Sequence, residues 1–166
     1  MMDKTYRVIN ELLVDLFDDI LYIEQSALQS GAFNDISVTE IHTINAIGMY
    51  EARSMSEVAA DLNITVGTLT TAIKKLIKKG YVERKRIEED RRVVQIQLTK
   101  KGKLAFRIHK KFHDDMIKIT TEGLNEIEKE ILTNALENLS NFFKEKYKIK
   151  KIDKCSKENK NEKCKN

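Results

Sequence analysis

The chain lacks tryptophan and proline, and aromatic residues make up only 7% of its 166 residues. This composition favours leucine and isoleucine packing between helices over a β-sandwich. No run approaches the roughly 18 consecutive apolar residues that a membrane span needs, and the N-terminus has no signal-peptide pattern. We therefore expect a cytoplasmic protein with no membrane partner. Its length suits one ordinary domain, or a small domain with the helices that dimerise it.

Only two cysteines are present, Cys155 and Cys164, and both lie in the lysine-rich segment 148–166. That segment has few apolar residues, which predicts a disordered tail. A disulfide there would constrain little of a core. We therefore expect two exposed, reduced thiols, with a redox or metal-binding role as the alternative.

Positive charge is concentrated in three segments, although the formal net charge of the whole chain is only +4. Residues 74–92 hold nine basic and four acidic side chains, residues 100–111 hold six basic and no acidic ones, and residues 148–166 hold eight and three. The rest of the chain is therefore acidic. A basic centre in an acidic chain indicates a local surface for a polyanion.

Helical periodicity dominates the first half of the chain. Apolar pairs that recur four residues apart predict a long amphipathic helix over residues 6–28. Capping-box patterns begin at Ser37 and at Ser54, and each predicts the start of a further helix. The first of these two helices should end near Gly48.

A helix-turn-helix and a hairpin follow. Residues 63–65 predict a turn, Thr65 caps the next helix, and Gly80 suits the left-handed residue that ends it. Two strands, at residues 81–87 and 93–98, then flank a charged tip. This hairpin has the pattern of a wing.

Two more helices are predicted after the wing. Thr99 caps a basic helix that continues to about Ile119. Apolar residues from Ile127 to Phe143 then mark a last amphipathic helix.

The helix over residues 66–79 has an apolar side and a polar side. Short threonine side chains at its N-terminal end can enter a major groove and contact base edges or thymine methyl groups. The lysines at its C-terminal end suit phosphates, although the simpler interpretation of lysines alone is a solvated face. Arginines at a wing tip can enter a minor groove, and Asp90 would orient one of them. The predicted DNA contacts are Thr65, Gly67, Thr68, Thr70, Thr71, Lys74, Lys75, Lys78, Arg84, Asp90, Arg91 and Arg92.

Several motifs together resemble the MarR family of bacterial transcription regulators. They are Gly-Thr-Leu-Thr-Thr at 67–71, Lys-Lys-Gly-Tyr-Val-Glu-Arg at 78–84, Asp-Arg-Arg at 90–92 and Leu-Thr-Lys-Lys-Gly at 98–102. The resemblance covers about residues 5–147. It implies a mainly α fold with a small β-wing, that is, a winged helix-turn-helix with intertwined N- and C-terminal dimerisation helices.

The same resemblance implies how the chain is organised and what it binds. Residues 1–34 and 114–147 would form the helical dimerisation region, residues 35–113 the DNA-binding region with its linking helix, and residues 148–166 the tail. The expected function is that of a homodimeric repressor on double-stranded DNA with an inverted-repeat operator.

Within this family, residues 35–37, 40–44, 66–71 and 109–113 are most similar to the repressors of fatty-acid biosynthesis in Gram-positive bacteria. That similarity implies a long-chain acyl group on acyl carrier protein as corepressor. An acyl chain needs an apolar channel and the acidic carrier needs a basic dock, although each apolar residue also suits an ordinary core. The expected effector contacts are Phe17, Leu21, Met49, Arg107, Lys110, Lys111, Phe112 and Met116.

The histidines leave an alternative open. His109 and His113 are four residues apart on one helix, which is a common metal-binding spacing. With Glu24 and His42 they resemble the ligand set of the zinc-responsive members of the family. We expect no cofactor, with histidines that hydrogen-bond helices together; the alternative is a zinc-responsive repressor of metal uptake.

Other classes of protein fit less well. The sequence has no nucleophile elbow, no phosphate-binding glycine loop and no paired carboxylates beside a base, so we expect no enzyme. A peroxide sensor of this family would need a reactive cysteine near the N-terminal helix, and the sequence has no cysteine there. A basic protein of purely structural or RNA-binding type would bind DNA without sequence preference.

Overall fold

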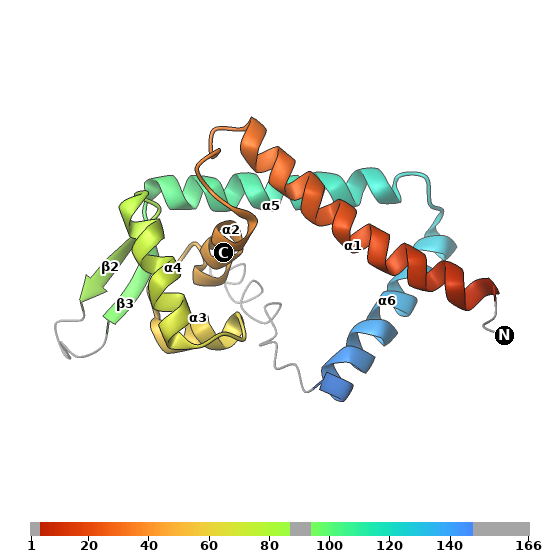
Figure 1. Ribbon diagram of the computed structural model, residues 1–166. Coiled ribbons are helices and arrows are strands. Elements are labelled where there is room, and N and C mark those ends of the chain that lie inside the picture. Colours follow the sequence, from red (N-terminus) through yellow and green to blue (C-terminus); the bar gives the residue numbers. More distant parts are fainter. Residues whose placement is uncertain (1–3, 87–93, 148–166) are drawn as a thin grey trace, which may run out of the picture.

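The computed structural model describes residues 4–86 and 94–147 (Figure 1). The helices are α1 (Lys4–Ser30), α2 (Val38–Ile47), α3 (Met55–Asp61), α4 (Val66–Lys78), α5 (Lys100–Thr121) and α6 (Glu126–Tyr147). The strands are β1 (Arg53–Ser54), β2 (Val82–Arg86) and β3 (Val94–Leu98). The predicted fold class, mainly α with a small β-wing, is confirmed. The predictions for Cys155, Cys164 and the tail concern residues outside the described ranges.

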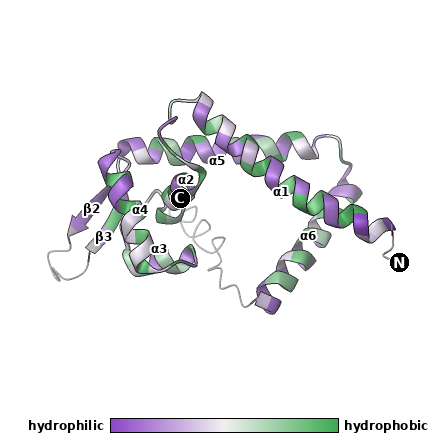
Figure 2. Cartoon of the chain, in the orientation of Figure 1, coloured by the Kyte–Doolittle hydropathy of each residue, from purple (hydrophilic) through white to green (hydrophobic). Residues whose placement is uncertain are grey.

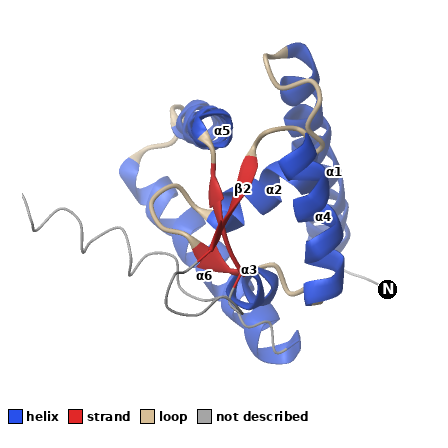
Figure 3. Ribbon diagram, turned by 90° about the vertical axis from the view of Figure 1, so that its left-hand side faces the viewer, coloured by secondary structure: helices blue, strands red, loops and turns tan. Residues whose placement is uncertain are grey.

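The strands form one antiparallel sheet in the order β1-β3-β2. Strands β2 and β3 pair from Val82 opposite Leu98 to their far ends, as the wing prediction requires. Strand β1 pairs with the other edge of β3, where Arg53 lies opposite Ile96. The sequence did not predict β1, because two residues are too few to show an alternating pattern. Figure 3 shows α2 and α4 to one side of the strands.

Side-chain caps begin the helices where the sequence predicts. The capping boxes at Ser37 and Ser54 are both complete. The hydroxyls of Thr65 and Thr99 each accept a hydrogen bond from the backbone N–H three residues later. Each such cap contributes about 1 kcal/mol, because it satisfies an amide at the start of a helix. Gly80 follows the C-cap residue Lys79 of α4 and has the left-handed backbone conformation predicted for it, with φ at 79°.

The hydrophobic core holds α4 against its neighbours. It lies between α2, α3, α4 and the sheet, and it continues to the start of α5. Its fully buried side chains include Ile41, Ile44, Val58, Leu69, Ile73, Leu76, Tyr81 and Ile96. The helix-turn-helix and the wing are therefore one packed unit.

Helices α1 and α6 leave most of their apolar side chains exposed. Figure 2 shows hydrophobic residues along both helices. Of α1, only Glu24 and Leu28 are buried. In the described structure no residue of α6 is buried, and Phe142 is 50% exposed. Apolar surface on this scale indicates a face that contacts another protein surface. The division into dimerisation and DNA-binding regions stays a prediction.

Candidate nucleic-acid interface

Helix α4 presents one buried side and one exposed side. Leu69, Ile73 and Leu76 are buried, as the helical periodicity predicts. Val66 is apolar, and helical periodicity predicts it on the buried side; as the first residue of the helix it is instead 45% exposed. The exposed side carries Gly67, Thr68, Thr71, Lys74, Lys75 and Lys78. The structure thus brings these predicted DNA contacts onto one continuous face.

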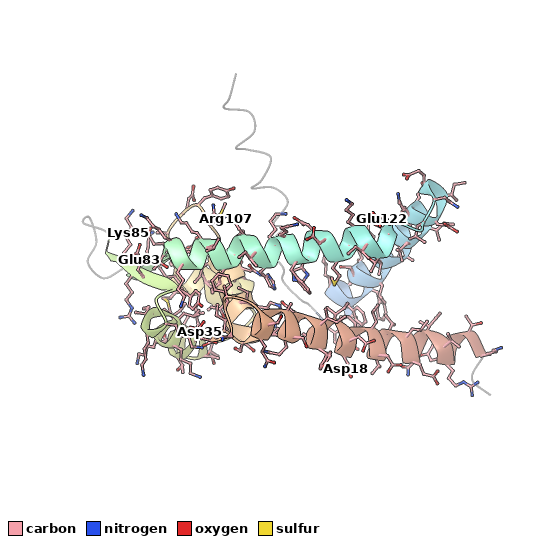
Figure 4. All side chains as sticks on the ribbon, turned by 90° about the horizontal axis from the view of Figure 1, so that it is seen from above. Asp18, Asp35, Glu83, Lys85, Arg107 and Glu122 are labelled. Atoms are coloured by element: carbon pink, nitrogen blue, oxygen red, sulfur yellow. The ribbon has the colours of Figure 1, made fainter. Side chains whose placement is uncertain are left out.

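The remaining predicted contacts lie around that face. Thr65 is exposed at the N-cap, and Thr70 is half-buried at the flank. Arg84 is exposed on β2, next to the exposed Lys85. Glu83 and Lys85 lie at the opposite end of α5 from Glu122 (Figure 4). The other three predicted contacts, Asp90, Arg91 and Arg92, lie outside the described residues.

Threonine hydroxyls in the first turns of α4 bond within the helix. The Thr70 hydroxyl donates to the Val66 carbonyl at 2.7 Å, and the Thr71 hydroxyl donates to the Gly67 carbonyl at 3.4 Å. The Thr68 and Thr65 hydroxyls lie 2.9 Å apart. These side chains are therefore held in defined rotamers before any ligand arrives.

The C-terminal end of α4 is attached to α2 by an ion pair. Lys79 Nζ donates to both carboxylate oxygens of Glu40, at 2.8 and 2.7 Å, and also to the Asp35 carbonyl. Glu40 in turn accepts from the Ser37 backbone N–H at 2.9 Å, which completes the capping box of α2. Lys79 is thus occupied inside the protein and differs from the exposed lysines of α4.

A second set of contacts joins the same corner to α5. The Tyr81 hydroxyl donates to Asp35 Oδ1 at 2.5 Å, and Lys101 Nζ lies 4.0 Å from the centre of the Tyr81 ring. Lys101 also donates to the Lys79 carbonyl at 3.1 Å. We call Asp35, Glu40, Lys79, Tyr81 and Lys101 the anchor network. It fixes the end of α4 relative to α2 and α5.

The charges of the anchor network are stabilised by these bonds. Burial by itself would raise the pKa of Glu40, but the hydrogen bonds from Lys79 and Ser37 hold it below the ordinary value of 4.5. Burial and the hydrogen bond to Asp35 raise the pKa of Tyr81. At neutral pH the network therefore contains an ionised Glu40 and a neutral tyrosine. No local sequence pattern predicts this network, since its partners are up to 66 residues apart.

The backbone at the start of α5 lies directly against the backbone of Tyr81. A Cβ atom at Gly102 would lie 2.1 Å from the Tyr81 carbonyl oxygen. The Thr99 hydroxyl donates to the Gly80 carbonyl at 2.7 Å and accepts from the Gly102 N–H at 3.1 Å. Glycine at position 102 is what permits this close approach.

A separate cluster joins α1, α2 and α5. Glu24 is only 2% exposed, and its Oε1 lies 2.9 Å from His42 Nε2 and in hydrogen-bond contact with His109 Nε2. His113 Nε2 lies 3.7 Å from the same oxygen and 3.2 Å from His109 Nε2. Asn45 Nδ2, which the sequence analysis missed, lies 2.6 Å from His109 Nδ1. Of the four residues of the zinc alternative, Glu24, His109 and His113 therefore have possible ligand atoms within 4.8 Å of one another. His42 lies outside that set and is joined to it by its contact with Glu24.

The protonation of this cluster follows from its burial. Burial lowers the pKa of His109 below its ordinary value of 6.5, although the carboxylate of Glu24 acts in the opposite direction. Burial by itself would raise the pKa of Glu24, but the hydrogen bond from His109 and the nearby imidazoles hold it below 4.5. At neutral pH an ionised Glu24 therefore accepts a hydrogen bond from a neutral His109.

The expected effector contacts lie on three parts of the chain. Phe17 and Leu21, on α1, are exposed, whereas Met49, after α2, is half-buried. On α5, Phe112 and Met116 are half-buried, and Arg107, Lys110 and Lys111 are exposed.

The two lysines of the expected basic dock already have acidic partners. Lys110 pairs with Asp114 at 3.1 Å, and Lys111 pairs with Asp115 at 2.7 Å. These pairs reduce the positive charge that the dock would offer to an acidic carrier. They are exposed and weak, so each lysine remains able to exchange its partner.

Comparison with known proteins identifies the family. The MarR family model matches residues 36–94. The regulator SarZ of Staphylococcus saprophyticus is 34% identical over 110 residues, which cover 65% of this chain and 70% of SarZ. The uncharacterized HTH-type regulator YhjH of Bacillus subtilis is 27% identical over 86 residues, which are 52% of this chain. The match spans about half, 49%, of the length of YhjH.

A solved structure gives a longer match. Streptococcus pneumoniae FabT, in complex with DNA, is 43% identical with a TM-score of 0.80, and the match covers 84% of this chain and 98% of that one. Among the residues that the structure describes, no helix has the length and apolar character to cross a membrane. The motifs, the packed wing and these matches agree, and the chain belongs to the MarR family.

Proposed function

We propose that this chain is a transcriptional repressor that binds duplex DNA, and that it is not an enzyme. The observation that carries the proposal is the exposed face of α4, where threonines precede Lys74, Lys75 and Lys78. A helix of this kind, on a packed helix-turn-helix beside a wing, suits the major groove. The 43% identity to FabT, whose structure contains DNA, supports the same function.

The proposed active form is a homodimer. A second copy would cover the apolar faces that α1 and α6 leave exposed, including Phe17, Leu136 and Phe142. A symmetric dimer offers two identical recognition helices, and the matching DNA site is an inverted repeat.

Selection of duplexes from a random library, followed by footprinting, tests this function. We expect enrichment of an inverted repeat whose half-sites lie about 34–36 Å apart, which is one helical turn. Enrichment of no sequence, or a footprint without dyad symmetry, would contradict the proposal.

The regulated process in this proposal is fatty-acid biosynthesis, with long-chain acylated acyl carrier protein as the corepressor. Support comes from the motifs at residues 35–37, 40–44, 66–71 and 109–113 and from the identity to FabT. The half-buried Phe112 and Met116 lie on the same helix as the basic residues Arg107, Lys110 and Lys111. An acyl chain and its acidic carrier could therefore contact one helix together.

Acylated carrier protein should raise operator affinity by about five-fold or more, whereas the unacylated carrier should not. The effect should grow with chain length, because each buried methylene contributes about 0.8 kcal/mol. Charge reversal at Lys110 and Lys111 should abolish the response and preserve basal DNA binding. Fluorescence anisotropy with a labelled operator measures both quantities.

Charge reversal at Lys118, which is exposed on the same helix, is the matched control and should preserve the response. Loss of basal binding in the Lys110 and Lys111 variant would mean that these residues contact phosphate. If acylated carrier protein leaves the operator affinity of the unmodified protein unchanged, the lipid proposal is wrong.

Zinc-dependent repression is the second candidate, and the Glu24 cluster favours it. The two imidazoles of His109 and His113 and the carboxylate of Glu24 have donor atoms within 4.8 Å of one another, and zinc prefers donors of these kinds. Donor atoms in a tetrahedral zinc site lie about 3.3 Å apart, since each bond is about 2.0–2.2 Å. His113 Nε2 lies 3.2 Å from His109 Nε2 and 3.7 Å from Glu24 Oε1, and both distances are close to that spacing. A zinc ion held by these three residues would connect α1 to α5.

Chelator treatment distinguishes the two candidates. If the cluster only hydrogen-bonds helices together, the metal-free protein should bind its operator with unchanged affinity, and this is the result we expect. Zinc titration followed by anisotropy measures it, with magnesium as the control ion because magnesium prefers oxygen ligands. Stoichiometric zinc binding that restores lost operator affinity, and that His109→Gln abolishes, would establish the zinc candidate instead.

A further inference from the structure

The first two turns of α4 expose methyl groups where a recognition helix needs side chains that distinguish bases. Residues 65–71 include no arginine, lysine, asparagine or glutamine. Those are the side chains that identify guanine or adenine through paired hydrogen bonds. Val66 is 45% exposed, and Thr68 and Thr71 are exposed too. The outer surface of these turns is therefore built from valine and threonine.

The threonine hydroxyls are partly withdrawn from that surface. Thr71 donates its hydroxyl to the Gly67 carbonyl, and Thr70 donates to the Val66 carbonyl. The Thr68 hydroxyl bonds to that of Thr65. A threonine bonded to the carbonyl four residues earlier keeps its oxygen near the backbone, so its methyl group becomes the more outward part of the side chain.

We infer that Thr71, together with Thr68, recognises thymine by contact with its C5 methyl group. That methyl group is the apolar feature of the major-groove edge, and apolar contact identifies it. The inference rests on the proposed DNA binding and specifies which base this helix reads. Lys74, Lys75 and Lys78 follow on the next turns, where contacts to phosphate set the position of the helix without reading sequence. Each half-site therefore contains thymines opposite the N-terminal turns of α4.

Uracil substitution tests this inference on the full chain. The probe is a duplex enriched from the random library, in which each thymine and its counterpart in the other half-site are replaced together by deoxyuridine, which lacks only the methyl group. The unmodified protein should lose about fourfold in affinity for each contacted thymine, as expected for one methyl-sized group. Anisotropy titration measures the loss.

Two variants separate the methyl group from the hydroxyl. Thr71→Ser removes the methyl group and should bind the thymine duplex as weakly as the unmodified protein binds the uracil duplex. It should then show no further loss with uracil, because the two changes remove one contact. Thr71→Val keeps a methyl group without the hydroxyl and should remain sensitive to uracil, unlike Thr71→Ser.

Thr120→Ser is the matched control, since the Thr120 hydroxyl also bonds to the carbonyl four residues earlier, but on α5. It should behave as the unmodified protein does. Three results would overturn the inference: equal affinity for every uracil duplex, affinity lost in Thr71→Val but kept in Thr71→Ser, or uracil sensitivity unchanged in Thr71→Ser. With an enriched sequence in hand, these results leave the proposed DNA binding intact. If the random library yields no enriched sequence, both the thymine inference and the proposed sequence-specific DNA binding are wrong.

Discussion

Replacement of Lys74, Lys75 and Lys78 by glutamine should greatly weaken DNA binding at low salt. All three are exposed on α4, and none of them forms an ion pair within the described residues. Each phosphate contact contributes about 0.9 to the slope of log affinity against log salt concentration. The proposed dimer carries each of these lysines twice, so the slope should flatten by about 5.4. Between about 200 and 50 mM salt, the affinity of the unmodified protein should therefore rise roughly 1,800-fold more than that of the variant. Anisotropy at several salt concentrations measures this slope.

The loss should be similar for operator and random duplex, because phosphates carry no sequence information. The matched control replaces Lys118, Lys144 and Lys146 by glutamine, which removes the same charge from exposed positions on α5 and α6. An equal change of slope in both triple variants would show a general effect of net charge and would remove the assigned phosphate contacts.

Alanine at Gly102 should destabilise the chain by about 3 kcal/mol or more, at the upper end of what overpacking costs. The added Cβ would lie 2.1 Å from the Tyr81 carbonyl oxygen and close to Leu98. Both neighbours belong to the packed core, so one backbone segment must move away from the other. Urea unfolding of the full chain, followed by circular dichroism, measures the free energy of unfolding.

Gly123→Ala is the control for this substitution. A Cβ at Gly123 has no atom within 4 Å, and the free energy of unfolding should change by less than about 1 kcal/mol. Equal stability of the two alanine variants would show that the start of α5 can shift at little cost.

Elements with a local sequence signal could be predicted, and those that depend on distant partners could not. Ser37, Ser54, Thr65 and Thr99 each mark a helix start through bonds within four residues. Strand β1 has no such signal, because it exists only by pairing with β3. Its position could therefore be assigned only from the three-dimensional pairing of the strands.

The candidate sites show the same limit. The exposed lysines of α4 could be assigned from helical periodicity, which separates buried from exposed positions. Lys79 has the same side chain one residue further on, yet it bonds to Glu40, 39 residues earlier in the chain. Asn45 likewise contacts His109 across 64 residues. Spacing along one helix predicts a shared face, but it says nothing of the partner on another helix.

The exposed apolar surface of α6 makes the stability of the proposed dimer depend on its concentration. A helix that buries no residue of its own within the described structure must draw its stability from the second copy. Dilution would then loosen α6 at the same time as it separates the two copies. An inverted repeat holds both copies together, so by linkage the bound operator would stabilise helices that never contact DNA. The melting temperature of α6 would therefore report operator occupancy from the opposite end of α5.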